Sequence, residues 1–479
     1  MLSRSKFCAA LIALGALSFP AAAQNAGGLG ADRAIPPTPD PVGSGARAAG
    51  MSNAFIAIAD DATAASWNPA GLVQLERPEI AIVGSLLSLR HDFSARSESG
   101  FGGDFEDDFA DLNFLSFSAP LPRPIFERNA TVSLSYQRRF DFNQSWRGRV
   151  SGASVLGLEP PLLLNQRTTL DFDQEGSLST ISPAFAIELT RQLSVGVALN
   201  LWRSSFLSDN GWKQSTQVNG VSLLGTTTSL SHGRSTEEYS DFSGENLTLG
   251  MLWKPTPRWS FGLRYDTAFT GTADYTARDR ELRFRLGSTV PLLNANVVRE
   301  KREISFPDTL ALGMAWRPND RLTVALDVSR TDWNDLIVKD RQGRRFSLVD
   351  GTDRANALQR TDFDPTWAVR LGSEYVFIPR EPGEDLPWLW TLRGGLSYEE
   401  EPASGRSDRN FFSKGNGEPD RFYGLSLGAG VLIGQRVNID LAWQMRYGPG
   451  VNGDLNPGVE GFDDDELRLP CHRVIEHVL

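Results

Sequence analysis

Apolar and polar residues alternate along several segments of this chain. In residues 436–447 one face would carry Val437, Ile439, Leu441, Trp443, Met445 and Tyr447, and the other Asn438, Asp440, Gln444 and Arg446. Residues 132–142, 193–201, 259–266 and 321–329 alternate in the same way. A period of two predicts β-strands with one apolar and one polar face.

The whole pattern predicts about fourteen such strands. They lie near residues 79–90, 111–119, 130–143, 178–189, 193–204, 246–254, 258–268, 308–317, 321–332, 365–378, 388–398, 422–433, 436–447 and 467–479. Short links, such as 190–192 and 318–320, alternate with long polar stretches. Short periplasmic turns and long extracellular loops are typical of outer-membrane barrels. We therefore predict an all-β, antiparallel transmembrane β-barrel over residues 79–479.

Two other all-β folds also contain alternating strands. A propeller would repeat a blade of about 40–50 residues, and the sequence shows no such repeat. A sandwich of this length would need several domains joined by linkers, and none stands out. Within the predicted second strand, residues 113–119 alternate poorly, which indicates a β-bulge there.

The first residues have the pattern of a secretory signal peptide. Arg4 and Lys6 precede the apolar stretch 7–19, and small residues at 21–23 form a cleavage site, so residues 1–23 are predicted to be removed. No later stretch has roughly 18 consecutive apolar residues, as a membrane-spanning helix would need. An exported chain of this kind is expected in the bacterial outer membrane.

Composition narrows the possible partners. With 48 Lys and Arg against 59 Asp and Glu, the net charge of −11 argues against a nucleic-acid partner. Two cysteines, Cys8 and Cys471, exclude a disulfide scaffold, and four histidines leave little for a metal site. We therefore expect no metal and no cofactor.

Residues 24–78 do not alternate and contain four notable runs. These are Gly45–Met51, Ala54–Phe55, Ala59–Ala62 and Trp67–Leu72. Together they resemble the N-terminal hatch of the FadL/TodX-type outer-membrane transporters. The resemblance implies a fourteen-stranded barrel plugged by residues 24–78. It also implies passive import of hydrophobic small molecules, either long-chain fatty acids or aromatic and aliphatic hydrocarbons.

By the same resemblance, Asn68, Pro69 and Ala70 form the element that holds the hatch in the lumen. Pro69 fixes its own φ and restricts Asn68 to an extended or turn geometry. The Asn68 side chain can then satisfy backbone groups that a buried irregular segment leaves open. Asp60 and Asp61 are expected to be caps or salt-bridge partners rather than a catalytic pair.

Charged residues fall on the polar face of the predicted strands, which would face the lumen. They are Arg139, Arg264, Arg370, Arg393 and Arg446, with Glu188, Asp266, Asp327, Glu374 and Asp440. One interpretation is structural, in which these charges pair with each other and with the plug. In the other, one or two of the arginines bind a substrate carboxylate in the bidentate geometry that arginine favours. Arg139, Arg264 and Arg393 are the candidates.

Two long stretches, 205–245 and 269–307, are predicted to be extracellular loops. The second contains Leu282, Phe284, Leu292 and Leu293 among other apolar residues. Exposed apolar patches tend to mark binding sites, although these residues could equally pack the loops together as a lid. The resemblance implies that the third and fourth extracellular loops form a first capture groove for substrate.

Two other functions remain open. The chain could be a non-transporting barrel that serves protein secretion or surface attachment. An outer-membrane lipid enzyme would need a Ser/His or Asp/His set, which the scarce histidines argue against. We expect a monomer surrounded by outer-membrane lipid and lipopolysaccharide. The predicted last strand is unusual, because Pro470 interrupts it and the chain ends on Leu479 rather than on an aromatic residue.

Overall fold

The structure of the protein is a computed structural model. It describes residues 44–94, 102–156, 162–224, 227–285, 291–346, 365–378, 388–401, 419–448, 453–454, 468–469 and 474–478. The predicted signal peptide, 1–23, and residues 24–43 of the predicted hatch lie outside this set. None of the helices in the described ranges is long and apolar enough to cross a membrane.

Within the described residues, three short helices precede the strands. They are α3 (Ala46–Ala49), α4 (Ala64–Trp67) and the 3-10 helix η1 (Pro69–Gln74). The strands that follow are β1 (Glu79–Ser94), β2 (Gly102–Pro120), β3 (Ala130–Asp141), β4 (Gln144–Leu156), β5 (Leu162–Glu188), β6 (Leu193–Trp202), β7 (Gly211–Leu224), β8 (Thr227–Thr256), β9 (Trp259–Asp266), β10 (Phe269–Arg285), β11 (Leu292–Phe306), β12 (Thr309–Asn319) and β13 (Leu322–Thr331). After η2 (Trp333–Asp335) come β14 (Ile337–Lys339), β15 (Arg345–Phe346), β16 (Thr366–Val376), β17 (Trp388–Glu401), β18 (Asp420–Ile433), β19 (Val437–Tyr447), β20 (Gly453–Asp454), β21 (Arg468–Leu469) and β22 (Val474–Val478).

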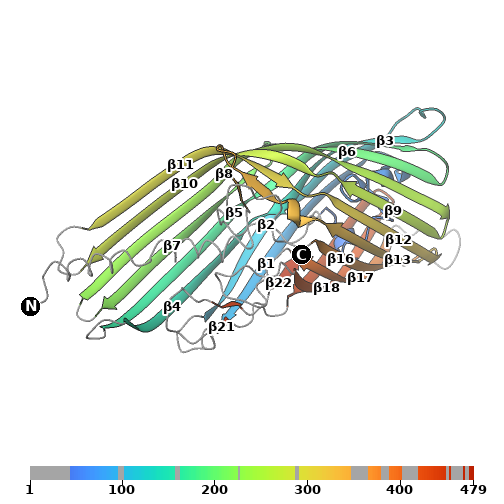
Figure 1. Ribbon diagram of the computed structural model, residues 1–479. Helices are drawn as coiled ribbons and strands as arrows, with labels where there is room; N and C mark the ends of the chain where they lie inside the picture. Colours follow the sequence, from blue (N-terminus) through green and yellow to red (C-terminus); the bar gives the residue numbers. More distant parts are fainter. Residues whose placement is uncertain are drawn as a thin grey trace, which may run out of the picture.

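The strands close into a barrel. In the part of the chain that the structure describes, one sheet holds 20 strands, and β20 and β21 form a separate pair. Antiparallel pairing runs through β1, β2, β3, β5, β6, β8, β9, β12, β13, β16, β17, β18, β19 and β22, and returns to β1 (Figure 1). The prediction of an all-β barrel is confirmed. Full closure leaves no free edge around the membrane-spanning wall.

Only part of the predicted closing strand lies within the described residues. β22 covers Val474–Val478 and pairs with both β1 and β19, whereas the sequence predicts a strand over 467–479. Pro470 lies outside the described residues.

The wall has the opposite polarity to a soluble protein. Large apolar side chains on the outer face are exposed, for example Ile80 and Ile82 at 70% and Leu441 at 72%. Small and polar side chains, such as Ser116 and Ser133, are buried on the inner face. This arrangement suits a wall that meets lipid outside and a polar lumen inside.

Tryptophans mark the end of the barrel that carries the short turns. Trp253, Trp259 and Trp316 are all partly exposed there, and the rings of Trp259 and Trp316 stack with their centroids 6.0 Å apart. Such rings are typical of the aromatic girdle at a membrane interface.

The prediction of long loops at 205–245 and 269–307 was wrong. Most of these residues form β7, the first half of β8, β10 and β11, which join β4 and the first half of β5 in an extension of the wall. We call these six strand segments the arm, and Figure 1 shows them reaching together beyond the rest of the barrel. Apolar alternation is weak in the arm because its outer face carries many polar residues, so the pattern that reveals lipid-facing strands is missing.

The predicted bulge lies at Asn113. The register between β1 and β2 shifts there, since Val83 pairs with Phe114 whereas Gly84 pairs with Leu112. Asn113 is buried, and its side chain donates a hydrogen bond to Ser85 Oγ over 2.5 Å. The extra residue therefore turns a polar side chain into the lumen.

Candidate functional site in the barrel lumen

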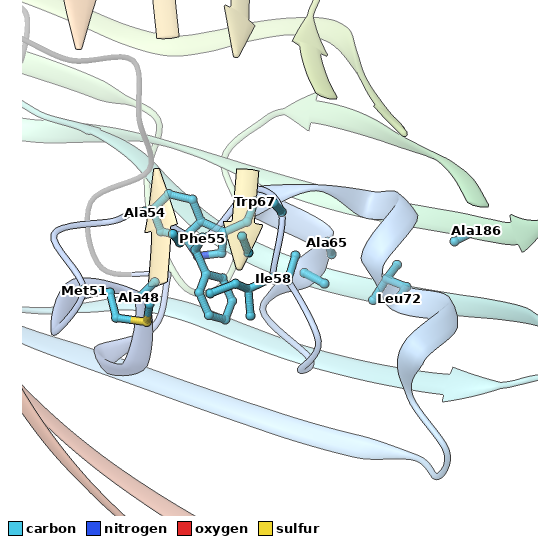
Figure 2. Packing of buried hydrophobic residues seen from close by; sticks show 14 of the residues in the cluster. Ala48, Met51, Ala54, Phe55, Ile58, Ala65, Trp67, Leu72 and Ala186 are labelled. Atoms are coloured by element: carbon cyan, nitrogen blue, oxygen red, sulfur yellow. The ribbon is translucent and has the colours of Figure 1, made fainter. Parts of the chain in front are cut away.

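Residues 44–78, which we call the N-terminal segment, lie inside the barrel. Small residues dominate the segment, and most of its residues up to Leu75 are buried. Figure 2 shows its apolar side chains packed together, with Phe55 against Trp67 at 6.2 Å between ring centroids. Its helices are too short to satisfy their own backbone groups, so the wall must supply partners.

Inward polar side chains of the wall provide these partners. Asp327 of β13, fully buried, accepts hydrogen bonds from the backbone N–H groups of Phe55 and Ile56, at 2.6 and 2.9 Å. Backbone carbonyls of the segment accept hydrogen bonds from the side chains of Ser116, Ser194, Ser260, Ser426 and Gln444. The segment is therefore hydrogen-bonded to strands all around the barrel.

Asn68 connects three parts of the structure. Its Nδ2 donates to the carbonyl oxygens of Ile56 and Met251, both at 3.0 Å, and its Oδ1 accepts from Ala70 N–H at 3.2 Å. Pro69 occupies the first position of η1, where a proline costs no hydrogen bond. Asn68 thus caps η1, and its side chain hydrogen-bonds both to Ile56 within the N-terminal segment and to Met251 of β8.

Glycines let the wall approach the segment closely. A Cβ atom added at Gly250 would lie 2.3 Å from Asn68 Oδ1, and one at Gly196 would lie 2.4 Å from the Pro69 carbonyl carbon. Similar close approaches to the segment occur at Gly262, Gly313, Gly372, Gly395 and Gly428. Glycine inside a strand often marks such an approach of another backbone.

Ion pairs add to the contact with the wall. Arg47 of α3 donates two hydrogen bonds of 2.8 Å to the two oxygens of Glu374 and a third, of 2.6 Å, to Asp60. Arg393 bridges Glu374 and Asp440, at 2.7 and 2.6 Å. Buried carboxylates of this kind need such partners because an unpaired buried charge is costly.

The two predicted acids have different partners. Asp60 also accepts a hydrogen bond from Arg317 of β12 at 3.2 Å, so it joins the segment to the wall. Asp61 accepts from the backbone N–H and the hydroxyl of Thr63, at 2.9 and 2.5 Å, and so shapes the turn before α4.

Polar residues form a level of the lumen just beyond the segment. Along β6 the inward positions run from Ser194 and Gly196, which contact the segment, to Asn200 and then Trp202. Asn200 accepts a hydrogen bond from Arg139 at 2.9 Å and donates one to Thr248. Two further arginines lie at this level of the wall, Arg264 paired with Asp266 at 2.6 Å and Arg370 hydrogen-bonded to Glu399 at 3.0 Å.

An aromatic cluster occupies the next level, on the side of the arm. Trp202 stacks on Phe269 at 5.0 Å between ring centroids and on Phe140 at 5.7 Å, and Phe306 stacks on Phe269 at 5.1 Å. The buried aromatic members of the cluster come from six strands, from η2 and from the link after β3: Phe140, Phe142, Trp202, Trp212, Tyr239, Phe242, Tyr275, Phe306 and Trp333. No pattern in the sequence predicted this cluster.

Arg302 lies at the edge of the aromatic cluster nearest the arm. Its guanidinium is over the Tyr275 ring, and it donates to Tyr239 Oη at 2.7 Å and to Glu300 at 2.8 Å. Burial raises the pKa of both the Tyr239 and the Tyr275 hydroxyl, so both stay protonated near neutral pH.

The predicted apolar capture residues lie on strands of the arm and not all on one face. Leu282 pairs directly with Leu293, and Phe284 lies two residues further along β10. These three side chains share a face, and Leu292 is on the opposite face. All four are exposed.

Comparison with known proteins identifies the family. Residues 167–448 match the family described as outer membrane protein transport protein (OMPP1/FadL/TodX). The chain belongs to the OMPP1/FadL/TodX family. Members of this family are outer-membrane transporters of hydrophobic compounds and act as passive channels, not as enzymes. No curated protein matches the sequence significantly.

One of the similar solved structures supports the fold of this OMPP1/FadL/TodX member. A FadL homologue from Pseudomonas aeruginosa is 13% identical, with a TM-score of 0.52, over 91% of this chain and 96% of that chain. The toluene transporter TodX from P. putida is 15% identical, with a TM-score of 0.46, over 87% and 92% of the two chains.

In this FadL/TodX member, exchanging Asn68 for aspartate should weaken the binding of the N-terminal segment to the wall. The Asn68→Asp variant would turn a carboxylate oxygen toward the carbonyl oxygens of Ile56 and Met251, where an N–H donor now lies. Each lost bond to a buried group costs about 1–3 kcal/mol. We expect earlier thermal unfolding in detergent and faster proteolysis within residues 44–78.

The matched control is Asn53→Asp in the same segment. Asn53 has a positive φ of 63°, a conformation that aspartate also tolerates. If the Asn68 and Asn53 variants were equally resistant to protease, the anchoring role of Asn68 would be wrong.

Proposed function

We propose that this protein lets hydrophobic small molecules, either long-chain fatty acids or aromatic and aliphatic hydrocarbons, pass the bacterial outer membrane by diffusion. The aromatic cluster carries this proposal. It places a group of packed aromatic rings in a lumen whose neighbouring level is lined by Asn200, Thr248 and charged residues. Transfer from water to such an apolar environment lowers the free energy of an apolar ligand, whereas it raises the free energy of an ion.

We propose further that residues 24–78 act as a hatch within a barrel of residues 79–479. The contacts of Asn68, Asp327 and Arg47 support this, because they bind the N-terminal segment to the wall below the aromatic cluster. They are hydrogen bonds and ion pairs, so a shift of the segment breaks no covalent bond. A molecule bound at the aromatic cluster could then pass the segment.

The inner face of the arm offers a route to the aromatic cluster. Leu292 lies on this face, as do Ala277 and Tyr275 further along. A fatty acid that reached the cluster would meet Arg139, which is adjacent to Phe140 in the sequence. Arg264 and Arg393 already hold carboxylates, which supports a structural role for these two.

Uptake measurements test the proposal. The protein would be expressed in a bacterial host that lacks its own channel for hydrophobic compounds, and uptake of radiolabelled oleate and toluene would be followed. We expect faster uptake of at least one of them than in cells expressing an unrelated barrel. Native mass spectrometry of the purified protein should give the mass of a single chain, with hydrophobic molecules bound.

No gain in uptake from correctly folded, membrane-inserted protein would contradict the proposal. Co-purification with a secreted protein would then favour the barrel that serves secretion or surface attachment.

A further inference from the structure

The outer face of the arm carries an unusual group of basic residues. On β10, Tyr275 and Ala277 point to the aromatic cluster, so Arg278 and Arg280 point outward, away from the lumen. Pairing places Arg234 of β8 and Arg299 of β11 on the same outward face. All four arginines are exposed.

Three of these arginines have no acidic partner among the described residues. Arg234 lies directly opposite Arg280, and its Nε donates only to Ser215 Oγ, at 3.3 Å. By contrast, Arg278 reaches Glu238 at 3.4 Å. Like charges directly opposite each other destabilise a sheet, and here they occur on a chain with a net charge of −11. A surface of this kind is better explained by an anionic partner than by stability of the sheet.

An apolar patch adjoins the arginines on the same outward face. It consists of Val221, Leu223, Leu230, Leu282, Phe284, Leu293 and Val297, all exposed, with Leu293 at 61%. The pairs Leu282–Leu293 and Val221–Leu230 and the pair Phe284–Leu230 make the patch continuous across β7, β8, β10 and β11. Basic and apolar residues side by side are the combination that binds a lipid surface with anionic headgroups.

The lipid around the barrel is too far away to cover this face. On β8 the lipid-facing residues end near Leu247, and at ~3.3 Å per residue Leu230 is about 55 Å further along the strand. Even with a strand tilt of about 45°, the patch stands well outside the hydrocarbon layer. A lipid partner must therefore come from outside the cell.

We propose that the outward face of the arm docks on anionic lipid aggregates, vesicles whose headgroups carry phosphate. Arg234, Arg280 and Arg299 bind the phosphates, for which the planar guanidinium is well suited. The apolar patch enters the boundary between headgroups and acyl chains. This surface is separate from the lumen, and the proposal does not depend on which molecule the lumen carries.

Vesicle flotation tests the proposal. The full chain would be held in nanodiscs of phosphatidylcholine and mixed with vesicles of phosphatidylcholine, with or without phosphatidylglycerol. We expect flotation only with the anionic vesicles, and less of it at high salt because screening weakens the attraction. The Arg234→Gln, Arg280→Gln, Arg299→Gln triple variant should bind about tenfold more weakly or worse.

The control variant removes three arginines from the opposite end of the barrel. Arg191, Arg258 and Arg436 are exposed there at the short turns, so Arg191→Gln, Arg258→Gln, Arg436→Gln alters the net charge equally. Its vesicle binding should equal that of the unchanged protein. Equal losses in both triple variants, equal binding to neutral vesicles, or a dimer that dissociates in the arm variant would each overturn the proposal.

Discussion

Replacing Gly250 with valine is expected to displace the N-terminal segment from the wall and to let ions pass through the barrel. A Cβ atom at this position would lie 2.3 Å from Asn68 Oδ1 and 2.9 Å from Ala70 N, far inside contact distance. Neither neighbour is the flexible end of a long side chain, because Asn68 is fully buried and anchored at both ends of its amide. The valine must therefore push the segment away from β8.

The expected effect is large. Overpacking costs about 1–3 kcal/mol, and each bond of Asn68 left unmade adds about 1–3 kcal/mol. About 1.4 kcal/mol corresponds to a factor of ten in an equilibrium constant. The ratio of protein with the N-terminal segment bound to the wall to protein with the segment displaced should therefore fall roughly 100-fold. Single-channel conductance in planar bilayers would rise, and cells expressing the variant would become sensitive to antibiotics that are normally too large to enter.

Gly233→Val is the matched control, because Gly233 is on the same strand and a Cβ atom there meets nothing within 4 Å. It should conduct as the unchanged protein does. A Gly250→Val barrel that stayed closed would show that the wall does not hold the segment in the way the glycines suggest.

Replacing Trp202 with alanine is expected to abolish most of the binding of hydrophobic substrate. Trp202 stacks on Phe140, Phe269 and Phe306, with centroids 5.0–6.2 Å apart. Aromatic pairs contribute about 0.5–1.5 kcal/mol each beyond their buried area, so loss of the central ring disorganises the surface that a ligand would contact. We expect affinity for labelled oleate or toluene to fall about tenfold to 100-fold.

Two further variants separate this effect from loss of folding. Trp202→Phe keeps a ring and loses only the 2.9 Å hydrogen bond from Nε1 to Asn246, so it should retain most of the affinity. Trp253→Ala removes a tryptophan from the outer face and should leave binding unchanged. Full binding by Trp202→Ala would mean that the aromatic cluster is not where substrate lies.

Much of the barrel could be predicted because lipid imposes a simple rule on it. Every lipid-facing position of a wall strand must be apolar. The period of two by itself therefore predicts strands at 436–447 and 321–329. The arm has no such rule, since water lies on its outer face. This is why 205–245 and 269–307 were predicted to be loops although they form strands.

The glycines of the wall strands are a further signal in the sequence. Gly196, Gly250 and Gly262 interrupt otherwise regular strands, where glycine is unfavourable. Glycines at these positions indicate that another part of the chain approaches the wall closely. Only the structure identifies this part as the N-terminal segment, because it lies more than a hundred residues away in the sequence.

The sequence by itself determined the membrane-spanning barrel and the family, and it singled out Asn68 as a candidate, because each depends on a local pattern of neighbouring residues. The partners of the charged residues, such as Arg47 with Glu374 and Arg393 with Asp440, were decided only by tertiary structure. The same holds for the aromatic cluster, whose rings come from strands far apart in the chain. Closing the barrel brings these residues together, and no pattern within a single strand encodes which strand will lie opposite across the lumen.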